Sequence, residues 1–324
     1  MGEDLARVPR RRPATGPTLL LRLLSPGARR CANFRRSVDP EDTLTIASAS
    51  PNPASAHQPS TKSHFDADQQ RAFADDGYFV LPSIVSKAEL QAVEQRLSSE
   101  FQQWSTGSQA FQGGGLLSGH LNCYPGDLVR GTMNELRATG TLDKLQSLFP
   151  TAPQRTRWGC NFNLPDSVEQ HYHMDGAYLD HYIIVNVAVV DTTLHNGAIE
   201  VVPQTHKRFY KFWQFAAGRV YRNAKRITME RGDVLVRLST VWHRGMPNRS
   251  ATPRPMLALT LGESYVNNPD PFAHNGGVLE FQPNWFKTDF LGQLRERITV
   301  RAPITYSGYR FARSLIGNKG YESP

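Results

Sequence analysis

The chain is poor in cysteine and has no long apolar segment. Its three cysteines, Cys31, Cys123 and Cys160, are spaced neither like a metal-binding motif nor like a disulfide framework. We therefore expect reduced thiols in an intracellular, cytoplasmic protein. The longest apolar patch near the N-terminus, Leu19–Leu24, contains Arg22 and is much shorter than the roughly 20 residues that span a bilayer. No membrane partner is predicted.

Acidic residues are scarce near the N-terminus, and this scarcity accounts for most of the net charge. Residues 1–62 contain ten Lys and Arg against five Asp and Glu, which is +5 of the chain's +8. This segment is rich in Pro, Ser, Ala and Arg, a composition that predicts a disordered basic tail. Residues 63–324 are nearly balanced in charge, and we expect them to form one domain without a nucleic-acid partner.

The tail has two further interpretations. Between Leu5 and Val38 it has nine arginines and no acid, which is the composition of a mitochondrial transit peptide. Glu3, Asp4 and the abundance of proline argue against a transit peptide. Mitochondrial targeting is therefore an alternative to the cytoplasm, and a dispensable extension is the other interpretation.

Helical patterns come first in the balanced region. Residues 65–76 read as a short helix that Gly77 ends, followed by a strand over 78–81. Ser86 and Glu89 form a capping box that opens a helix to about Trp104. Residues 105–130, rich in Gly and Ser, predict a loop, and a second helix is expected over 142–148.

Strand patterns dominate the rest of the chain. Residues 182–190 are almost continuous Ile and Val, as in a strand that is covered on both faces. Further strands are expected over residues 157–163, 197–202, 227–229, 234–238 and 256–261. Helices followed by many short strands predict an α+β fold with a double-stranded β-helix core (a jelly roll, cupin-like) on which the N-terminal helices pack.

A His-x-Asp pair in this strand-rich region is a candidate metal site. His173 and Asp175 lie two residues apart, and side chains i and i+2 of a strand point to the same side. His243 lies seventy residues further along, and a rolled-up sheet would bring it to the same point. Two imidazoles and one carboxylate match the facial triad that holds Fe(II) and leaves three coordination positions open.

Arg254 follows the distal histidine by eleven residues. A guanidinium at this distance is suited to bind the far carboxylate of a dicarboxylic co-substrate through a two-pronged hydrogen bond. Together with the His/Asp/His set, this residue points to an oxygenase.

Three local segments resemble the phytanoyl-CoA dioxygenase family of Fe(II)/2-oxoglutarate oxygenases. Residues 73–82 are similar to its entry segment. Residues 196–207 resemble its Asn-Gly…Val-Pro-Gly-Ser-His-Lys stretch, with Gln204 in place of the usual Gly, and residues 243–254 resemble its distal-histidine segment. The likeness runs from about residue 65 to 265 in the expected order, so residues 63–324 are expected to be the dioxygenase domain.

The resemblance implies a mechanism and a set of cofactors. His173, Asp175 and His243 would bind Fe(2+). The co-substrate 2-oxoglutarate would chelate the metal and pair its 5-carboxylate with Arg254, and O2 would take the last position. Ascorbate would act as a stimulating reductant. The reaction expected is oxygenation, typically hydroxylation of a small metabolite, with release of succinate and CO2.

Two asparagines are candidates for binding the co-substrate. Asn186 is the one strongly polar residue of the 182–190 strand, and its place matches a position of the family that lines the co-substrate pocket. Asn161 lies on one face of the preceding strand, together with Asn163, and the same argument applies to it. The alternative for each is an amide that neighbouring backbone satisfies.

Other histidines and one basic segment are further candidates for a functional role. His171 forms a His-x-His pair with His173 but lacks the Glu that cupins place four or five residues later, so a supporting role is favoured. His181, His195 and His206 are expected to be structural or solvent-facing. Residues 207–226 hold seven Lys and Arg, no acid and six aromatics, which favours a lid over nucleic-acid binding, with simple packing on the barrel as the alternative.

Two functions are consistent with these features. The first is a 2-oxoglutarate-dependent dioxygenase acting on a small molecule. The sequence reveals neither the identity of this substrate nor the oligomeric state of the protein. The second is a non-catalytic jelly-roll module that binds a sugar, an anionic ligand or nucleic acid through the basic aromatic segment. The complete His/Asp/His set with its downstream arginine favours the enzyme.

Overall fold

The computed structural model describes residues 64–149, 155–180, 182–262 and 277–317. The chain divides between residues 57 and 58, and every described residue belongs to the second unit. The predicted tail over residues 1–62 lies outside the described residues. Among the helices described, none is long and apolar enough to cross a membrane.

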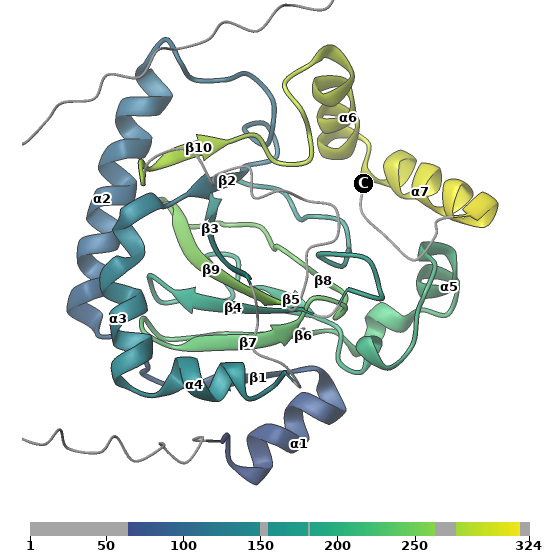
Figure 1. Ribbon diagram of the computed structural model, residues 1–324. Coiled ribbons are helices and arrows are strands. Elements are labelled where there is room, and N and C mark those ends of the chain that lie inside the picture. Colours follow the sequence, from purple (N-terminus) through teal and green to yellow (C-terminus); the bar gives the residue numbers. More distant parts are fainter. Residues whose placement is uncertain (1–63, 150–154, 181, 263–276, 318–324) are drawn as a thin grey trace, which may run out of the picture. The chain divides into compact units, whose positions relative to one another are not determined.

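Two antiparallel sheets form the core of the fold (Figure 1). The larger sheet has the order β1-β7-β4-β9-β3-β2-β10 and the smaller one the order β6-β5-β8. The strands of the larger sheet are β1 (Tyr78–Leu81), β2 (His120–Tyr124), β3 (Arg155–Asn163), β4 (Tyr182–Ala188), β7 (Val234–Leu238), β9 (Arg254–Gly262) and β10 (Glu280–Gln282). Those of the smaller sheet are β5 (Glu200–Val201), β6 (Lys225–Arg226) and β8 (His243–Arg244). The predicted α+β jelly-roll core is confirmed.

Helices cover one face of the larger sheet. They are α1 (Ala67–Asp76), α2 (Lys87–Thr106), α3 (Arg130–Ala138) and α4 (Thr141–Gln146), and α2 and α3 run along one side of the strands in Figure 1. Leu90, Val93 and Leu97 of α2 pack with Val185 of β4 and Leu259 of β9 in the main core. Burial of each such side chain contributes roughly 1.5–3 kcal/mol.

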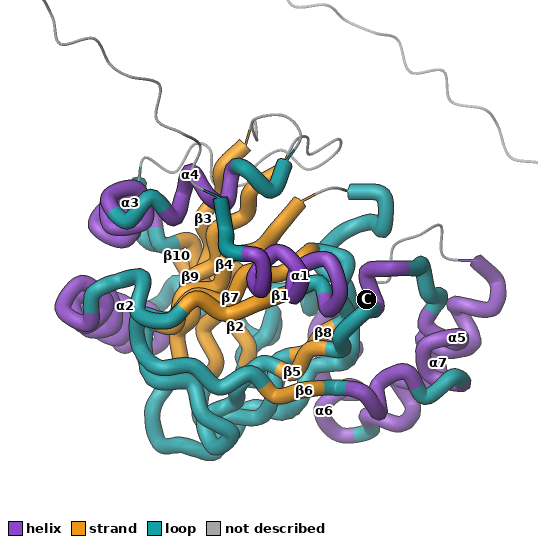
Figure 2. The backbone as a smooth tube through the Cα atoms, turned by 90° about the horizontal axis from the view of Figure 1, so that it is seen from below, coloured by secondary structure: helices purple, strands orange, loops and turns teal. Residues whose placement is uncertain are grey.

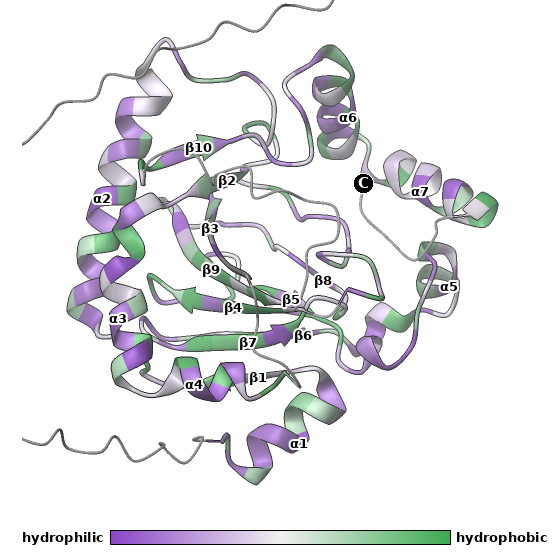
Figure 3. Cartoon of the chain, in the orientation of Figure 1, coloured by the Kyte–Doolittle hydropathy of each residue, from purple (hydrophilic) through white to green (hydrophobic). Residues whose placement is uncertain are grey.

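Strand periodicity assigns each side chain of β4 to one of two faces. Ile183, Val185 and Val187 join the helix-covered core, whereas Asn186 lines the cavity on the opposite, concave face. All seven residues of β4 are buried, which explains why the strand reads as an almost continuous apolar run. Figure 3 shows the same apolar colouring along β4, β7 and β9.

The first helix and strand meet at a glycine turn. Asp66 and Gln69 form a capping box at the start of α1, and Gly77 ends the helix with a left-handed φ of 84°. A Cβ at Gly77 would lie 2.5 Å from Nδ1 of His206 and 2.6 Å from a methyl group of Val241. The turn therefore needs glycine both for its backbone angle and for close packing.

Further helices flank the open end of the sheets. They are the short helices η2 (Thr205–Lys207), α5 (Phe212–Ala217) and η3 (Val220–Asn223), and the C-terminal helices α6 (Phe290–Arg301) and α7 (Pro303–Gly317). The short helix η1 (Gly126–Val129) instead leads directly into α3 and contacts it. In Figure 2, α5, α6 and α7 gather on the side away from α2 and α3. Phe212, Phe215 and Trp242 form a small core here with Met174 and Val202.

Several predicted elements need correction. The predicted loop over 105–130 contains strand β2 and helix η1, because Leu121 and Cys123 alternate into the main core while His120 and Asn122 face the cavity. The predicted strand over 227–229 is only an isolated bridge of Met229 to Thr192. The strand expected over 197–202 shortens to β5. Helices α3, α6 and α7 had no counterpart in the prediction.

Candidate active site

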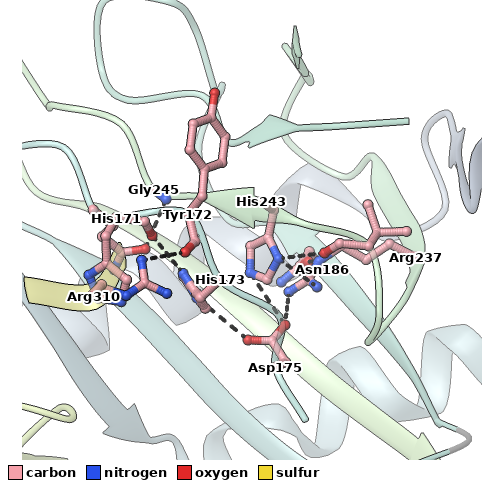
Figure 4. A network of polar contacts seen from close by, with 11 residues as sticks. His171, Tyr172, His173, Asp175, Asn186, Arg237, His243, Gly245 and Arg310 are labelled. Carbon is pink, nitrogen blue, oxygen red and sulfur yellow. Dashed lines mark hydrogen bonds and ion pairs between the residues drawn. The ribbon is translucent and has the colours of Figure 1, made fainter. Parts of the chain in front are cut away.

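The predicted metal ligands come together at one end of the sheets (Figure 4). His173 lies between β3 and β4 and forms an isolated antiparallel bridge with His243 of β8. Backbone N–H groups donate in both directions across this bridge at 3.0 Å, and the Asp175 N–H donates to the Ser239 carbonyl at 3.1 Å. One ligand atom from each of His173, Asp175 and His243 lies within 4.8 Å of the others. Met174 between them is buried in the small core, as the alternation of a strand requires.

Hydrogen bonds hold both imidazole rings so that one nitrogen of each ring faces the Asp175 carboxylate. Nδ1 of His173 lies 2.9 Å from the His171 carbonyl, and Nδ1 of His243 lies 2.9 Å from the Val241 carbonyl. A carbonyl only accepts, so Nδ1 carries the proton in each ring and Nε2 keeps its lone pair. The two Nε2 atoms lie 3.8 and 3.4 Å from Asp175 carboxylate oxygens.

The electrostatics of the site favour the protonation states that bind a metal. Burial lowers the pKa of His173 to about 3, and His243 adds to the shift. Burial alone would raise the pKa of Asp175, but Arg237 and His243 hold it well below its usual value. Neutral imidazole beside an ionised carboxylate is the state in which these groups act as ligands.

Arg237 is a site residue that sequence reasoning missed. Its Nη2 lies 2.5 Å from Oδ2 of Asp175, and its Nε donates to Oδ1 of Asn186 at 3.1 Å. The side chain is buried, with 3% exposure. A single charge in the apolar strand Val234–Leu238 was the signal that could have indicated it, because a buried guanidinium needs a partner.

Asn186 lies in the cavity wall, and its side-chain oxygen already has a partner. Its Oδ1 accepts from Arg237, while its Nδ2 is buried and has no partner among the described residues. Asn161 also lines the cavity, on β3. Their predicted contact with a co-substrate is a proposal that the geometry permits.

Arg254 begins β9 and enters the same cavity as the triad. Its Nη2 donates to the Gly197 carbonyl at 3.1 Å, and its Nε is buried without a partner in the described structure. Burial lowers the pKa of Arg254 to about 10, so the side chain is still cationic at neutral pH. A buried cation with an unused donor is suited to receive a carboxylate.

The triad and Arg254 share a cavity of about 420 Å³. This volume lies in the range of small-molecule sites. Asn122, Asn161 and Trp285 form other parts of its wall. The cavity can therefore hold a metal, a dicarboxylate and part of a second organic molecule.

The remaining histidines do not join the triad. The His171 ring lies against Trp285 and Tyr306 with centroid separations of 5.2 and 5.6 Å, and its carbonyl orients His173, which fits the supporting role. Nε2 of His206 lies 3.2 Å from the Ala74 carbonyl. His195 is exposed, and His181 lies outside the described residues.

The basic aromatic segment over residues 207–226 packs against Trp242, the residue that precedes His243. Phe215 stacks on Trp242, with ring centroids 4.3 Å apart and an interplanar angle of 12°. None of the described cavity-lining residues comes from this segment. Packing next to His243 is thus the role that the structure displays.

The chain is similar to one known family and to several solved structures. The sequence model of the phytanoyl-CoA dioxygenase (PhyH) family matches residues 130–256. Among solved structures, AviO1 from Streptomyces viridochromogenes Tue57 is 16% identical, with a TM-score of 0.50 over 65% of this chain and 100% of that chain. The epimerase SnoN, solved with Fe3+, alpha ketoglutarate and nogalamycin RO, is 15% identical over 60% of this chain and 82% of that chain, with a TM-score of 0.49. HygX from Streptomyces hygroscopicus, solved with nickel and 2-oxoglutarate, is 15% identical over 63% and 89%, with a TM-score of 0.48.

The resemblance to the phytanoyl-CoA dioxygenase family is therefore confirmed. With the family match and the His/Asp/His triad together, the chain is a non-haem Fe/2-oxoglutarate-dependent oxygenase, an oxidoreductase. The alternative of a non-catalytic binding module is set aside.

Proposed function

We propose that His173, Asp175 and His243 hold Fe(II) and that the protein hydroxylates a small molecule while 2-oxoglutarate is converted to succinate and CO2. The observation that carries this proposal is the convergence of three ligand atoms within 4.8 Å on the wall of a small-molecule cavity. Bound Fe(II) supplies the oxidation chemistry with O2. The protein supplies the ligands and the orientation of both organic reactants.

Arg254 is proposed to bind the 5-carboxylate of 2-oxoglutarate. It is a cation of the cavity that is not paired with a carboxylate in the described structure, whereas Arg237 is paired with Asp175. Asn163 faces Arg254 across the β3–β9 ladder, and its buried Oδ1 has no described partner. Asn186 would act beside the site by holding Arg237.

Oxygenation is favoured over halogenation. A halide would need the coordination position that the carboxylate takes, and Asp175 is directed there by Arg237 and by its own backbone hydrogen bond. Incubation of the unaltered enzyme with chloride and its substrate should give a product heavier by one oxygen atom, or lighter by two hydrogens. A chlorinated main product would show that Asp175 is not a ligand.

Metal titration tests the assignment of the ligands. Calorimetry with Ni(II), which is stable in air, should give one site in the unaltered protein and a large loss of affinity in His173→Ala, Asp175→Ala and His243→Ala. Glu169→Gln is the matched control, because this carboxylate is half exposed and pairs with Arg244 instead. Unchanged nickel binding by the three variants would refute the assignment.

The cytoplasm is proposed as the location, with mitochondrial targeting as the alternative. Residues 1–62 are proposed to contribute nothing to the chemistry, because every cavity residue named above comes from 120–285. A chain beginning at Ser63 should keep the succinate-forming rate of the full chain. A folded but inactive shortened chain would contradict this.

A further inference from the structure

A row of three carboxamides crosses the concave face of the larger sheet. Gln282 of β10 is the register partner of Asn122 on β2, and Asn122 is the partner of Asn161 on β3. Next in the row is Met256 of β9, the register partner of Asn161, which lies two residues after Arg254 on the same strand. Asn122 and Asn161 line the cavity that contains the triad. The row therefore begins near the proposed co-substrate site and leads outward.

These carboxamides are not used to hold the fold together. The hydrogen bonds of the described residues include none made by the side chains of Gln282, Asn122 or Asn161, and Asn161 is exposed. By contrast, Asn284 close by donates to the His120 carbonyl and accepts from the Phe286 N–H. Each carboxamide of the row thus keeps both a donor and an acceptor for a ligand.

The charged groups of the cavity are already assigned. Among the described lining residues, the charged side chains are Asp175, Arg237 and Arg254. The first two pair with each other, and the third is proposed to bind 2-oxoglutarate. His120 is neutral near pH 7, because burial lowers its pKa to about 4. No described cation or anion is left for a charged group of the substrate.

Trp285 provides a flat wall next to the metal site. Its ring centroid lies 5.3 Å from that of His173, and its indole Nε1 is buried without a described partner. An aromatic face beside unused donors and acceptors is suited to a ring that carries hydroxyl groups at its edge and C–H bonds on its face. The C–H bonds would then lie toward the triad.

We propose that the substrate is an uncharged polyhydroxylated molecule, such as a sugar, a glycoside or a cyclitol. Its hydroxyl groups bind to Asn122 and to Asn161, which is thereby assigned to the substrate in place of the co-substrate, and one face of its ring lies on Trp285. This inference rests on the proposed function. One oxygen atom of O2 enters a C–H bond of the ring to form C–OH, and the other enters succinate as 2-oxoglutarate loses CO2. An apolar chain would strip the carboxamides of water without replacing their hydrogen bonds, and a phosphate or carboxylate would find no counter-charge.

Turnover of defined probes by the full-length enzyme with Fe(II), 2-oxoglutarate and O2 tests the proposal. The neutral probes are methyl β-D-glucopyranoside, methyl α-D-mannopyranoside, sucrose and myo-inositol. The charged or apolar probes are glucose 6-phosphate, octanoyl-CoA and decanoic acid. We expect a neutral probe to raise succinate formation above the rate without probe and to gain one oxygen atom. Oxygenation of a charged or apolar probe alone, or no response to any neutral probe, would overturn the proposal.

Two comparisons keep the result interpretable. Slow succinate formation without any probe tests the proposed function separately, so its absence would count against the oxygenase site and not against the substrate class. With the active probe, Asn122→Leu and Asn161→Leu should each raise KM roughly tenfold, as expected for one lost hydrogen bond. Asn134→Leu, on the exposed side of α3, is the matched control and should leave KM unchanged. Thermal unfolding checks that each variant is folded, and an unchanged KM in both cavity variants would contradict the assigned contacts.

Discussion

At the scale of single residues, two buried arginines of one cavity differ in their partners. Arg237 pairs with the Asp175 carboxylate and the Asn186 amide. Nη2 of Arg254 donates to a backbone carbonyl, and its Nε is without a described partner. Arg237 is therefore a positioning residue for the Asp175 carboxylate. Arg254 still has a hydrogen-bond donor with which to bind a co-substrate. Their substitutions should therefore have different effects.

Arg254→Lys should raise KM for 2-oxoglutarate by roughly tenfold or more. Lysine keeps the positive charge but loses the planar, two-pronged hydrogen bond. Succinate formation measured over a range of 2-oxoglutarate concentrations checks this. Arg249→Lys is the control, because Arg249 is exposed and lies outside the cavity. An unchanged KM in Arg254→Lys would mean that another residue holds the 5-carboxylate.

Arg237→Met should destabilise the metal-free protein more than the metal-loaded protein. Without Arg237, the Asp175 carboxylate has lost its 2.5 Å ion pair, and breaking one side of a buried pair costs roughly 3 kcal/mol. A bound divalent ion replaces part of the lost positive charge. Thermal unfolding with and without Ni(II) should show a larger metal-induced increase in Tm for the variant. Equal loss of stability in both states would contradict this role of Arg237.

The convergence of the three candidate ligands could be predicted from the sequence, whereas the partner of Arg237 could not. The i, i+2 spacing of His173 and Asp175 is local and has a direct geometric meaning, and the family resemblance supported the choice of His243 and Arg254 as their partners. The contact of Arg237 with Asp175 depends on a residue 62 positions away and on the β4–β7 pairing. No local pattern encodes that distance.

At the scale of whole elements, apolar periodicity decided which parts of the fold could be predicted. Strands β1 and β7 agree with their predicted bounds, and β4 and β9 differ by two residues at most at each end. Strand β2 was missed because His120 and Asn122 face the cavity and make its sequence look like a polar loop. Helix α6 was missed because its buried positions are Gly292, Glu296 and Thr299, which form no apolar stripe.

Helix α6 is held by one buried carboxylate. Oε1 of Glu296 accepts from the N–H and from the hydroxyl of Ser118 at 2.8 and 3.0 Å, and Glu296 has no exposed surface. Glu296→Ala should leave the Ser118 N–H buried without a partner and loosen the helix.

Hydrogen exchange is the measurement for this variant. Faster exchange is expected over Phe290–Arg301, with little change in α2 or β4. Glu280→Ala, at an exposed position of β10, is the control. Exchange in α6 that matches the unaltered protein would show that other contacts hold the helix.

At the scale of the whole molecule, buried histidines link stability to pH. The pKa of His120 falls to about 4 on folding, against about 6.5 in the unfolded chain. Between these values the unfolded chain binds the extra proton and the folded chain does not. Stability is therefore complete above about pH 6.5 and decreases as the pH falls toward 4, by up to about 3 kcal/mol for this residue.

Urea unfolding at pH 7 and pH 4.5 checks the size of this effect. His120→Gln keeps a hydrogen-bond donor near the Val168 carbonyl and removes the titrating group. The difference in unfolding free energy between the two pH values should therefore be smaller in the variant. An equal difference in both proteins would show that His120 does not contribute.

The site formed by His173, Asp175 and His243 is proposed to carry out 2-oxoglutarate-dependent oxidation. Its most direct test is succinate formation from 2-oxoglutarate by protein that is reconstituted anaerobically with Fe(II) and then exposed to O2. The unaltered protein should form succinate in an Fe(II)-dependent reaction, and Asp175→Ala should form none above background because the triad has lost its carboxylate. Near-normal succinate formation by Asp175→Ala would contradict the account.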